Sequence, residues 1–281
     1  MNARPNRQAY DQYNKRGERA QNLVGIIILL SVAIAVAGIF YWRHQVAAER
    51  LVLDPKTYCP VGGALARTVI LVDLSDPITA IQQQKLENLI ASFAVPGSPL
   101  EVEAGDMLEL YLLKPNVTDQ IPTPTVSICN PGDGEGISEF TGNPRLARKR
   151  FEQRFATPLQ EALVGLEAVE PANTSPLIEA LRGIAVTSFE YDAKRGHENR
   201  LYVISDMLQH SAQLSLYKTP HPDTAVLAPL RADLDRVAST AIYVVSRASN
   251  DSLQGKEFVL FWQKYFKSSG TTLTTMEKWA E

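Results

Sequence analysis

The sequence predicts a doubly wound α/β domain with a mostly parallel sheet, placed behind one N-terminal transmembrane helix. From residue 67 onward, apolar runs of strand length alternate with segments of helical spacing, which is typical of parallel strands joined by crossover helices. A run without charged residues precedes this part of the chain. The composition, 45% apolar and 21% charged, is ordinary for a globular protein, and the net charge of -3 gives no electrostatic reason to expect nucleic-acid binding.

The uncharged run, Leu23–Trp42, reads LVGIIILLSVAIAVAGIFYW. At a rise of about 1.5 Å per residue it is long enough to cross a bilayer core of about 30 Å. Tyr41 and Trp42 stand at its end, where aromatic side chains favour the membrane interface. The alternative, a cleaved signal peptide, predicts a shorter apolar region followed by a small-residue cleavage site. We therefore expect an uncleaved single-pass anchor, whose alanine-rich surface would also allow it to assemble with other membrane helices.

Basic residues around the run predict its orientation, because they favour the cytoplasmic side. Those before it are Arg4, Arg7, Lys15, Arg16 and Arg19, and those after it are Arg43, Arg50 and Lys56. The bias puts residues 1–22 in the cytoplasm as a polar tail. Residues 43–66 are then a linker, and residues 67–281 form the α/β domain outside the cytoplasm, in the periplasm if the source is bacterial.

The chain has two cysteines, Cys59 and Cys129, and both follow the anchor. One disulfide in an oxidising compartment fits this pattern, and the alternative is two separate buried thiols. A zinc site would need further cysteine or histidine residues nearby. We expect the disulfide, which would tie the start of the domain to a point inside the fold.

The elements of the domain follow in order. Thr68–Asp73 is a continuous apolar run, as in a strand buried on both faces. Pro77–Phe93 has helical spacing, with Pro77 at the first helical position and Asp76 as its N-cap. The further strands expected are Asp106–Leu113, Thr125–Cys129, Arg200–Leu208, Thr240–Ser246 and Thr271–Thr275. The further helices expected are Arg145–Phe155, its continuation from Thr157 to Leu166, one starting at Ser175-Pro176, and Gly255–Phe266.

Three polar clusters fall where a doubly wound sheet binds ligands, outside the carboxyl ends of its strands. Asp73, Ser75 and Asp76 follow the first strand. Residues 173–175 (Asn-Thr-Ser) stand at the start of a helix, and Asp206 lies near the end of the strand that begins at residue 200. The clusters are far apart in sequence, but we expect them at the same edge of the sheet.

These residues resemble the metal-ion-dependent adhesion site of von Willebrand factor type A (vWA) domains, which have a Rossmann-like fold. That family carries Asp-x-Ser-x-Ser, a distant threonine and a distant aspartate. Asp73 and Ser75 match the first two positions, Thr174 matches the threonine, and Asp206 matches the aspartate. The third motif position is Pro77, which has no side-chain ligand. The resemblance covers essentially the whole domain after the anchor.

The resemblance implies a Mg²⁺ site and a protein partner. Mg²⁺ prefers oxygen ligands in octahedral geometry. The implied ligands are Asp73, Ser75, Thr174 and Asp206, with Asp76 as an auxiliary ligand. An acidic residue of the partner protein would fill an open coordination position. The alternative is a degenerate site kept as a scaffold, in which Asp76 and Ser175 are ordinary helix caps.

The leading hypothesis is therefore a membrane-anchored, non-enzymatic module that presents an Mg²⁺-dependent or degenerate site to a partner protein. The alternative is a metal-assisted hydrolase of the phosphatase-like type, with Asp73 as nucleophile or ligand. Such an enzyme needs a second carboxylate and a basic phosphate clamp. Asp206 supplies the carboxylate, and the sequence offers no convincing lysine or arginine for the clamp.

Overall fold

A computed structural model describes residues 29–32, 34–38, 52–113, 122–135, 142–164, 173–220, 222 and 224–280. The chain divides into two compact units, Met1–Leu51 and Val52–Glu281. Over the described ranges, no helix is both long enough and apolar enough to cross a membrane. Most of the expected anchor, Leu23–Trp42, lies outside the described residues.

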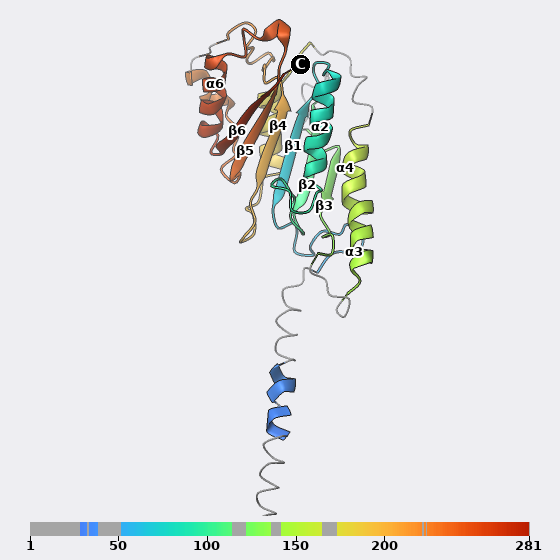
Figure 1. The fold of residues 1–281 in the computed structure, drawn as a ribbon. Coiled ribbons are helices and arrows are strands. Elements are labelled where there is room, and N and C mark those ends of the chain that lie inside the picture. Colours follow the sequence, from blue (N-terminus) through green and yellow to red (C-terminus); the bar gives the residue numbers. More distant parts are fainter. Residues whose placement is uncertain are drawn as a thin grey trace, which may run out of the picture. The chain divides into compact units, whose positions relative to one another are not determined.

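Six strands form one sheet in the second unit, in the order β3-β2-β1-β4-β5-β6 (Figure 1). They are β1 (Arg67–Asp73), β2 (Met107–Leu113), β3 (Val126–Cys129), β4 (Arg200–Ser205), β5 (Ser239–Val245) and β6 (Thr272–Trp279). This is the doubly wound order. All neighbouring pairs are parallel except β2 and β3, which are antiparallel. The predicted α/β class with a mostly parallel sheet is confirmed.

The antiparallel β3 is an exception to the parallel pairing that the sequence pattern favours. Only about a dozen residues join β2 to β3, which is the lower limit for a crossover connection, whereas an antiparallel return needs no helix. Two strand ends also differ from the prediction. β4 ends at Ser205 rather than Leu208, and β6 continues past Thr275 to the buried Trp279.

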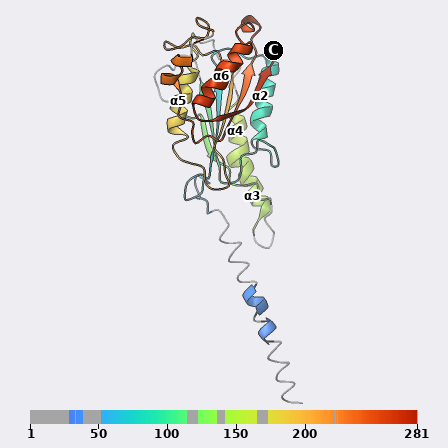
Figure 2. The same ribbon diagram turned by 90° about the vertical axis from the view of Figure 1, so that its left-hand side faces the viewer.

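Helices cover both faces of the sheet (Figure 2). They are α2 (Ala80–Ser92), α3 (Pro144–Phe151), α4 (Thr157–Glu161), α5 (Leu177–Thr187) and α6 (Lys256–Ser268). Alternate side chains of a strand point to opposite faces. Val69 and Leu71 of β1 join the core under α5 and α6, whereas Ile70 and Val72 join the core under α2, α3 and α4. The continuous apolar run of β1 is thus explained by burial on both faces.

Helix α2 begins at Ala80, later than predicted. Thr79, and not Asp76, is its N-cap. The Thr79 hydroxyl accepts a hydrogen bond from the Gln82 amide at 3.3 Å, and the Gln82 side chain accepts one from the Thr79 amide at 3.1 Å. This is a capping box. The Thr-x-x-Gln spacing in the sequence indicates this helix start. Pro77 indicated an earlier start, because proline also suits a first helical position.

The two helices expected around residues 145–166 form one continuous segment. After α3 the chain passes through a π-helical turn, Glu152–Ala156, and enters α4 directly. Thr157 has helical backbone angles (φ -62°, ψ -49°) and is therefore not a cap. Phe155 and Leu159 are fully buried against the sheet. The predicted end at Leu166 lies outside the described residues.

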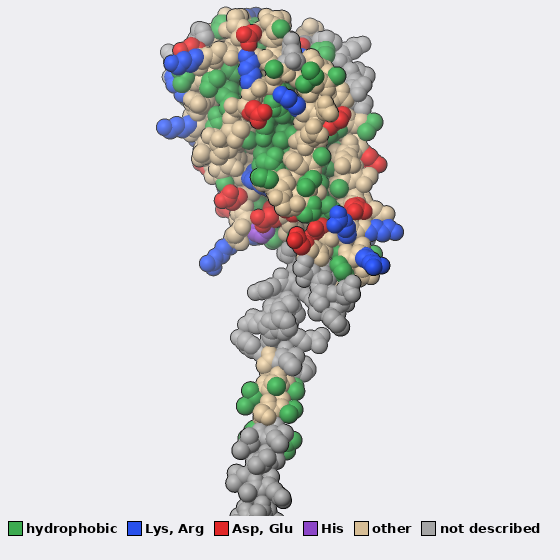
Figure 3. All heavy atoms as spheres, viewed as in Figure 1, with side chains coloured by type: hydrophobic (Ala, Val, Ile, Leu, Met, Phe, Trp, Pro, Cys, Tyr) green, Lys and Arg blue, Asp and Glu red, His purple; other side chains and the backbone are tan. Residues whose placement is uncertain are grey.

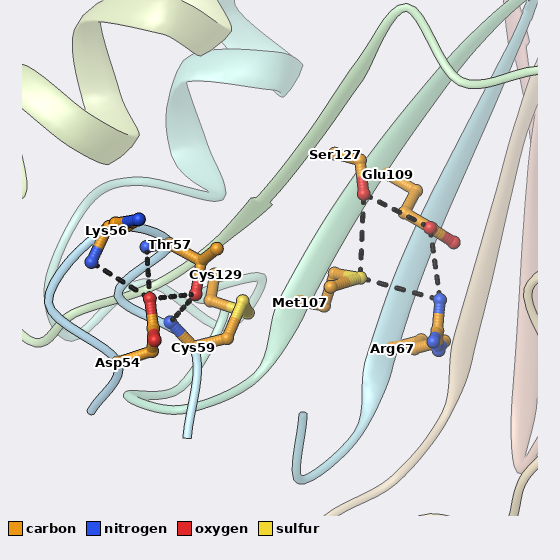
Figure 4. Close-up of a disulfide and its surroundings, with 9 residues drawn as sticks. All are labelled: Asp54, Lys56, Thr57, Cys59, Arg67, Met107, Glu109, Ser127 and Cys129. Atoms are coloured by element: carbon orange, nitrogen blue, oxygen red, sulfur yellow. Dashed lines mark hydrogen bonds and ion pairs between the residues drawn. A yellow bond between two sulfur atoms is a disulfide. The ribbon is translucent and has the colours of Figure 1, made fainter. Parts of the chain in front are cut away.

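Cys59 and Cys129 form a disulfide, as predicted (Figure 4). Their Cα atoms are 5.0 Å apart, and the bond joins the segment before β1 to the last residue of β3. Next to it, Oδ1 of Asp54 accepts hydrogen bonds from the amides of Lys56 and Thr57 at 2.9 and 2.8 Å. The disulfide closes a loop with a sequence separation of 70 residues. Closing a loop of that length stabilises a fold by about 4 kcal/mol in the chain-entropy account.

Candidate functional site

The candidate site lies at the carboxyl ends of β1 and β4, which are neighbours in the sheet. β1 ends at Asp73 and β4 ends at Ser205. Val72 pairs with Ile204 in the sheet, so the two strands end at the same level. The strand order runs toward β2 and β3 on one side of this pair and toward β5 and β6 on the other. This is the topological switch point, where doubly wound sheets bind their ligands.

Asp73 is the centre of a hydrogen-bonded cluster. Its Oδ2 accepts hydrogen bonds from the hydroxyls of Ser175 and Ser205, each at 2.8 Å, and its Oδ1 accepts one from the Ser75 amide at 2.9 Å. The side chain is buried, with 5% of the residue exposed. A carboxylate is costly to bury unless it is well hydrogen-bonded. The three bonds supply that compensation and join the ends of β1 and β4 to the segment before α5.

Ser175 reaches Asp73 because its own segment is held by backbone pairing. Ser175 and His210 exchange two backbone hydrogen bonds, both of 2.8 Å. Pro176, and not Ser175, stands at the N-cap position of α5, and it makes no side-chain cap. The interpretation of Ser175 as a helix cap is therefore wrong. The predicted ligand Thr174 lies one residue earlier and is half-buried, whereas the hydroxyl that contacts Asp73 belongs to Ser175.

Asp206 directly follows β4 and is also buried. Its Oδ1 accepts a hydrogen bond from the Leu208 amide at 2.9 Å, and its backbone carbonyl accepts one from the Gln254 side chain at 3.0 Å. Burial, followed by the negative charge of Asp73, raises the pKa of Asp206 to about 7. The Asp206 carboxyl group is thus close to its titration midpoint at neutral pH. A buried carboxyl group next to another carboxylate commonly shows this behaviour.

Arg247 brings a positive charge to the same edge. Its Nε lies 3.9 Å from Oδ2 of Asp206, and its Nη1 donates a hydrogen bond to the carbonyl of Pro77. The arginine side chain is only 13% exposed. Pro77 occupies the third motif position, so the guanidinium spans from Asp206 to the position that lacks a side-chain ligand. Arg247 was not among the predicted site residues, although its place just after the predicted strand Thr240–Ser246 put it at this edge.

The rim of the site carries an exposed tyrosine and a further carboxylate. Tyr217 is 40% exposed, and its ring packs edge-on against His210 with the centroids 5.4 Å apart. Burial, and then the negative charges of Asp206 and Asp76, raise the pKa of Tyr217, so its phenol stays protonated at neutral pH. Asp76 is half-buried. Its charge also raises the pKa of Asp206, so Asp76 lies close to the cluster.

The residues at this edge fit a bound Mg²⁺ only in part. Asp73, Ser75 and Asp206 are hard oxygen donors of the kind that Mg²⁺ prefers. The Oδ2 atom of Asp73 already accepts two hydroxyl hydrogen bonds, and the Pro77 carbonyl accepts one from Arg247. The guanidinium of Arg247 thus already occupies the backbone oxygen of the third motif position.

A second cluster lies elsewhere and was missed from the sequence. In the described part of the chain, one group of three histidine, cysteine or acidic side chains is close enough to share a metal ion: Glu103, Asp106 and His197. Asp106 directly precedes β2 and His197 lies just before β4. The group therefore belongs to the opposite, amino edge of the sheet. The structure thus contains an acidic and histidine cluster that can hold a divalent metal, separate from the predicted ligands.

Comparisons with known proteins give only a weak likeness. No family model and no curated protein matches the chain. BatB from Bacteroides thetaiotaomicron is 10% identical over 76% of this chain and 91% of BatB, with a TM-score of 0.39. An aerotolerance-related membrane protein from Bacteroides fragilis is 11% identical over 75% of this chain and 92% of that one, with a TM-score of 0.34. Proximal thread matrix protein 1 from the mussel byssus, solved with a zinc-occupied MIDAS motif, is 9% identical to this chain. The match covers 76% of this chain and 44% of that one, with a TM-score of 0.35. Likeness at this level carries no argument about the site.

Proposed function

We propose that the chain is a membrane-anchored, vWA-like protein-binding module that holds a partner protein at the carboxyl edge of its sheet without needing a metal. One observation carries this proposal. Asp73, Ser175 and Asp206 come from three distant segments and converge at the switch point, where doubly wound folds bind their ligands. The module has no enzymatic activity in this proposal.

The membrane anchor and the location of the domain are part of the proposal. The length of the uncharged run Leu23–Trp42 supports a membrane span, and the basic residues before it support a cytoplasmic N-terminus. The Cys59–Cys129 disulfide supports an oxidising location for the domain, such as the periplasm of a bacterium. Assembly through the anchor helix is a further expectation.

The edge is suited to binding because its shape is fixed before a partner arrives. The hydrogen bonds to Asp73 and the bridge from Arg247 to the Pro77 carbonyl hold the first turn after β1. A site that is already ordered loses less conformational entropy on binding. Tyr217 is exposed at the rim of this ordered region. Tyrosine is enriched among the residues that contribute most to protein interfaces, so Tyr217 is the expected anchor point.

The charge of the edge indicates the chemistry of the partner. Asp73, Asp76 and Asp206 outnumber Arg247, the positive charge placed among them. The edge therefore attracts a basic side chain of the partner. The Mg²⁺-dependent version makes the opposite prediction, because a bound cation would select an acidic side chain. The sign of the partner's charge separates the two versions.

The hydrolase alternative receives less support from the contacts of Asp73. A nucleophilic carboxylate must have a free oxygen lone pair within reach of a substrate. Asp73 is 5% exposed and accepts three hydrogen bonds, two of them on Oδ2. Arg247, the cation that could have clamped a phosphate, is only 13% exposed and already donates to the Pro77 carbonyl. These contacts favour a structural role for Asp73 within a binding surface.

The proposal is tested by crosslinking from the rim. A photoreactive phenylalanine analogue replaces Tyr217 in the full-length protein, in its native membrane. The matched control places the same analogue at Tyr191, which is 66% exposed and lies before β4, away from the carboxyl edge. We expect a specific protein adduct from position 217, unchanged by a chelator, and none from position 191. Equal adducts from both positions would overturn the proposed surface, and loss of the adduct with chelator would support the metal-dependent version.

A further inference from the structure

At the amino edge of the sheet, Glu103, Asp106 and His197 bring their ligand atoms within 4.8 Å of one another. Nδ1 of His197 lies 2.8 Å from Oδ1 of Asp106 and 3.5 Å from Oε2 of Glu103. Acidic side chains and a histidine gather at this end of the domain in the space-filling view (Figure 3). The cluster shares no residue with the carboxyl edge.

Two of these ligand atoms are buried without a hydrogen bond. Asp106 is 3% exposed. Its Oδ1 and Nδ1 of His197 have no hydrogen-bond partner in the described part of the chain, although the two atoms are 2.8 Å apart. The contact is close enough for an ion pair, but it lacks the alignment of a hydrogen bond. Buried polar atoms left in this way are unfavourable, and a cation bound between them would satisfy both.

The spacing of the atoms fits a metal ion. Metal bonds of about 2.1 Å place neighbouring ligand atoms about 3.0 Å apart in octahedral geometry and about 3.4 Å apart in tetrahedral geometry. The separations from His197 to Asp106 and Glu103, 2.8 and 3.5 Å, lie on either side of these values. One imidazole and two carboxylates suit a first-row transition metal better than Mg²⁺, which favours oxygen ligands alone.

Two tight turns hold the cluster in place. Glu103–Asp106 and Lys194–His197 are each closed by a backbone hydrogen bond of 3.0 Å. Each turn contains a glycine in the left-handed region, Gly105 at φ 89° and Gly196 at φ 88°, which other residues adopt only with strain. Leu65 connects the turns, because its amide donates to the Gly105 carbonyl at 3.0 Å and its carbonyl accepts from the Lys194 amide at 2.6 Å. The ligands are therefore presented by a fixed backbone.

An open cavity of about 300 Å³ lies against the cluster and is also lined by Glu198 and Arg200. Three protein ligands with an open position are typical of zinc sites that bind water or a further ligand, whereas structural zinc sites have four. The cavity leaves space for that further ligand. Arg200, whose guanidinium also donates to the Glu101 carbonyl at 2.7 Å, adds a positive charge to the lining of the cavity.

We propose that Glu103, Asp106 and His197 bind a divalent transition metal of the Zn²⁺ type, with an open coordination position facing the cavity. This site is independent of the proposed partner-binding edge. His197 coordinates through Nδ1, and each carboxylate supplies one oxygen.

The test is calorimetric titration of the chelator-treated, full-length protein in detergent, without an affinity tag, using ZnCl₂ and then MgCl₂. We expect one equivalent of Zn²⁺ to bind with a raised melting temperature, and Mg²⁺ to bind at least about tenfold more weakly. His197→Ala and Glu103→Gln should each abolish the stoichiometric binding. The Glu103 side chain is 64% exposed, so Glu103→Gln keeps the fold even if a change at the buried Asp106 does not.

His210→Ala is the matched control, because it removes a histidine at the opposite edge and should leave Zn²⁺ binding unchanged. Binding that is absent in the wild type overturns the proposal. Binding that persists in both Glu103→Gln and His197→Ala also overturns it, since the metal then sits elsewhere. A Tyr217→Ala variant that loses its partner but keeps Zn²⁺ binding would separate this site from the proposed function.

Discussion

The Ser205 hydroxyl donates a hydrogen bond to Oδ2 of Asp73 at 2.8 Å, across a sequence separation of 132 residues. This contact ties the carboxyl ends of β1 and β4 together at the switch point of the sheet. The Ser175 hydroxyl donates to the same oxygen. Asp73 is therefore primarily an acceptor that holds three segments in register.

Replacing Asp73 by alanine should destabilise the protein strongly. Ser175 and Ser205 would lose their acceptor while remaining buried, and the Ser75 amide would lose its own. We expect a loss of about 3 kcal/mol in the free energy of unfolding. Urea unfolding of the full-length protein measures it. The control is Asp76→Ala at the half-buried neighbouring position, and an equal loss in both variants would contradict the central role of Asp73.

The stability of the protein should depend on the ionisation of Asp206. Its pKa rises from a usual value of 3.8 to about 7 in the folded state, chiefly through burial. Between these values the folded state binds more protons than the unfolded state, so the free energy of unfolding falls as the pH rises from about 4 to about 7. Asp206→Asn removes this contribution, so we expect the variant to lose less stability over that range. Denaturant unfolding of the wild type and of Asp206→Asn at several pH values tests this prediction. Parallel curves of unfolding free energy against pH would contradict it.

Reduction of the disulfide should destabilise the domain by about 4 kcal/mol, because the loop that it closes is long. The measurement is the denaturant midpoint with and without reductant. A Cys59→Ser/Cys129→Ser variant should start at the lower midpoint and show no response to reductant. A wild-type midpoint that reductant leaves unchanged would mean that the bond contributes nothing to stability.

The proposed topology can be tested in cells. A reporter enzyme that is active only outside the cytoplasm, fused after residue 50 in a bacterial host, should be active because the basic residues retain the N-terminus inside. The same reporter fused after residue 20 should be inactive. Activity of the second fusion, with none from the first, would show the reverse orientation.

Four strands, β1, β2, β4 and β5, were predictable because their apolar runs are continuous, as burial on both faces requires. The direction of β3 was not predictable from its composition, since it depends on the short connection from β2. The start of α2 was misjudged because Pro77 and Thr79 both give helix-start signals, and only the capping box at Thr79 forms. Neighbouring start signals of this kind can be separated only by the hydrogen bonds that form.

The site was predictable to the level of the sheet edge. The rule for doubly wound sheets brought Asp73 and Asp206 together, but it does not say which nearby hydroxyl meets Asp73. Ser175, next to the predicted ligand Thr174, makes that contact. The cluster around Asp106 and His197 has no spacing motif, since its members precede β2 and β4, which both flank β1. Only the strand order brings these two residues close together.

The central claim is that Arg247, rather than a metal, supplies the positive charge at the carboxyl edge. The most direct measurement is the melting temperature of the full-length protein as Mg²⁺ is added, for the wild type and for Asp73→Asn. A ligand that binds the folded state must stabilise it. We predict that Mg²⁺ shifts both melting temperatures equally, by no more than its weak binding at Glu103, Asp106 and His197 produces. A rise in the wild type that is absent in Asp73→Asn would contradict the claim and establish a metal site at Asp73.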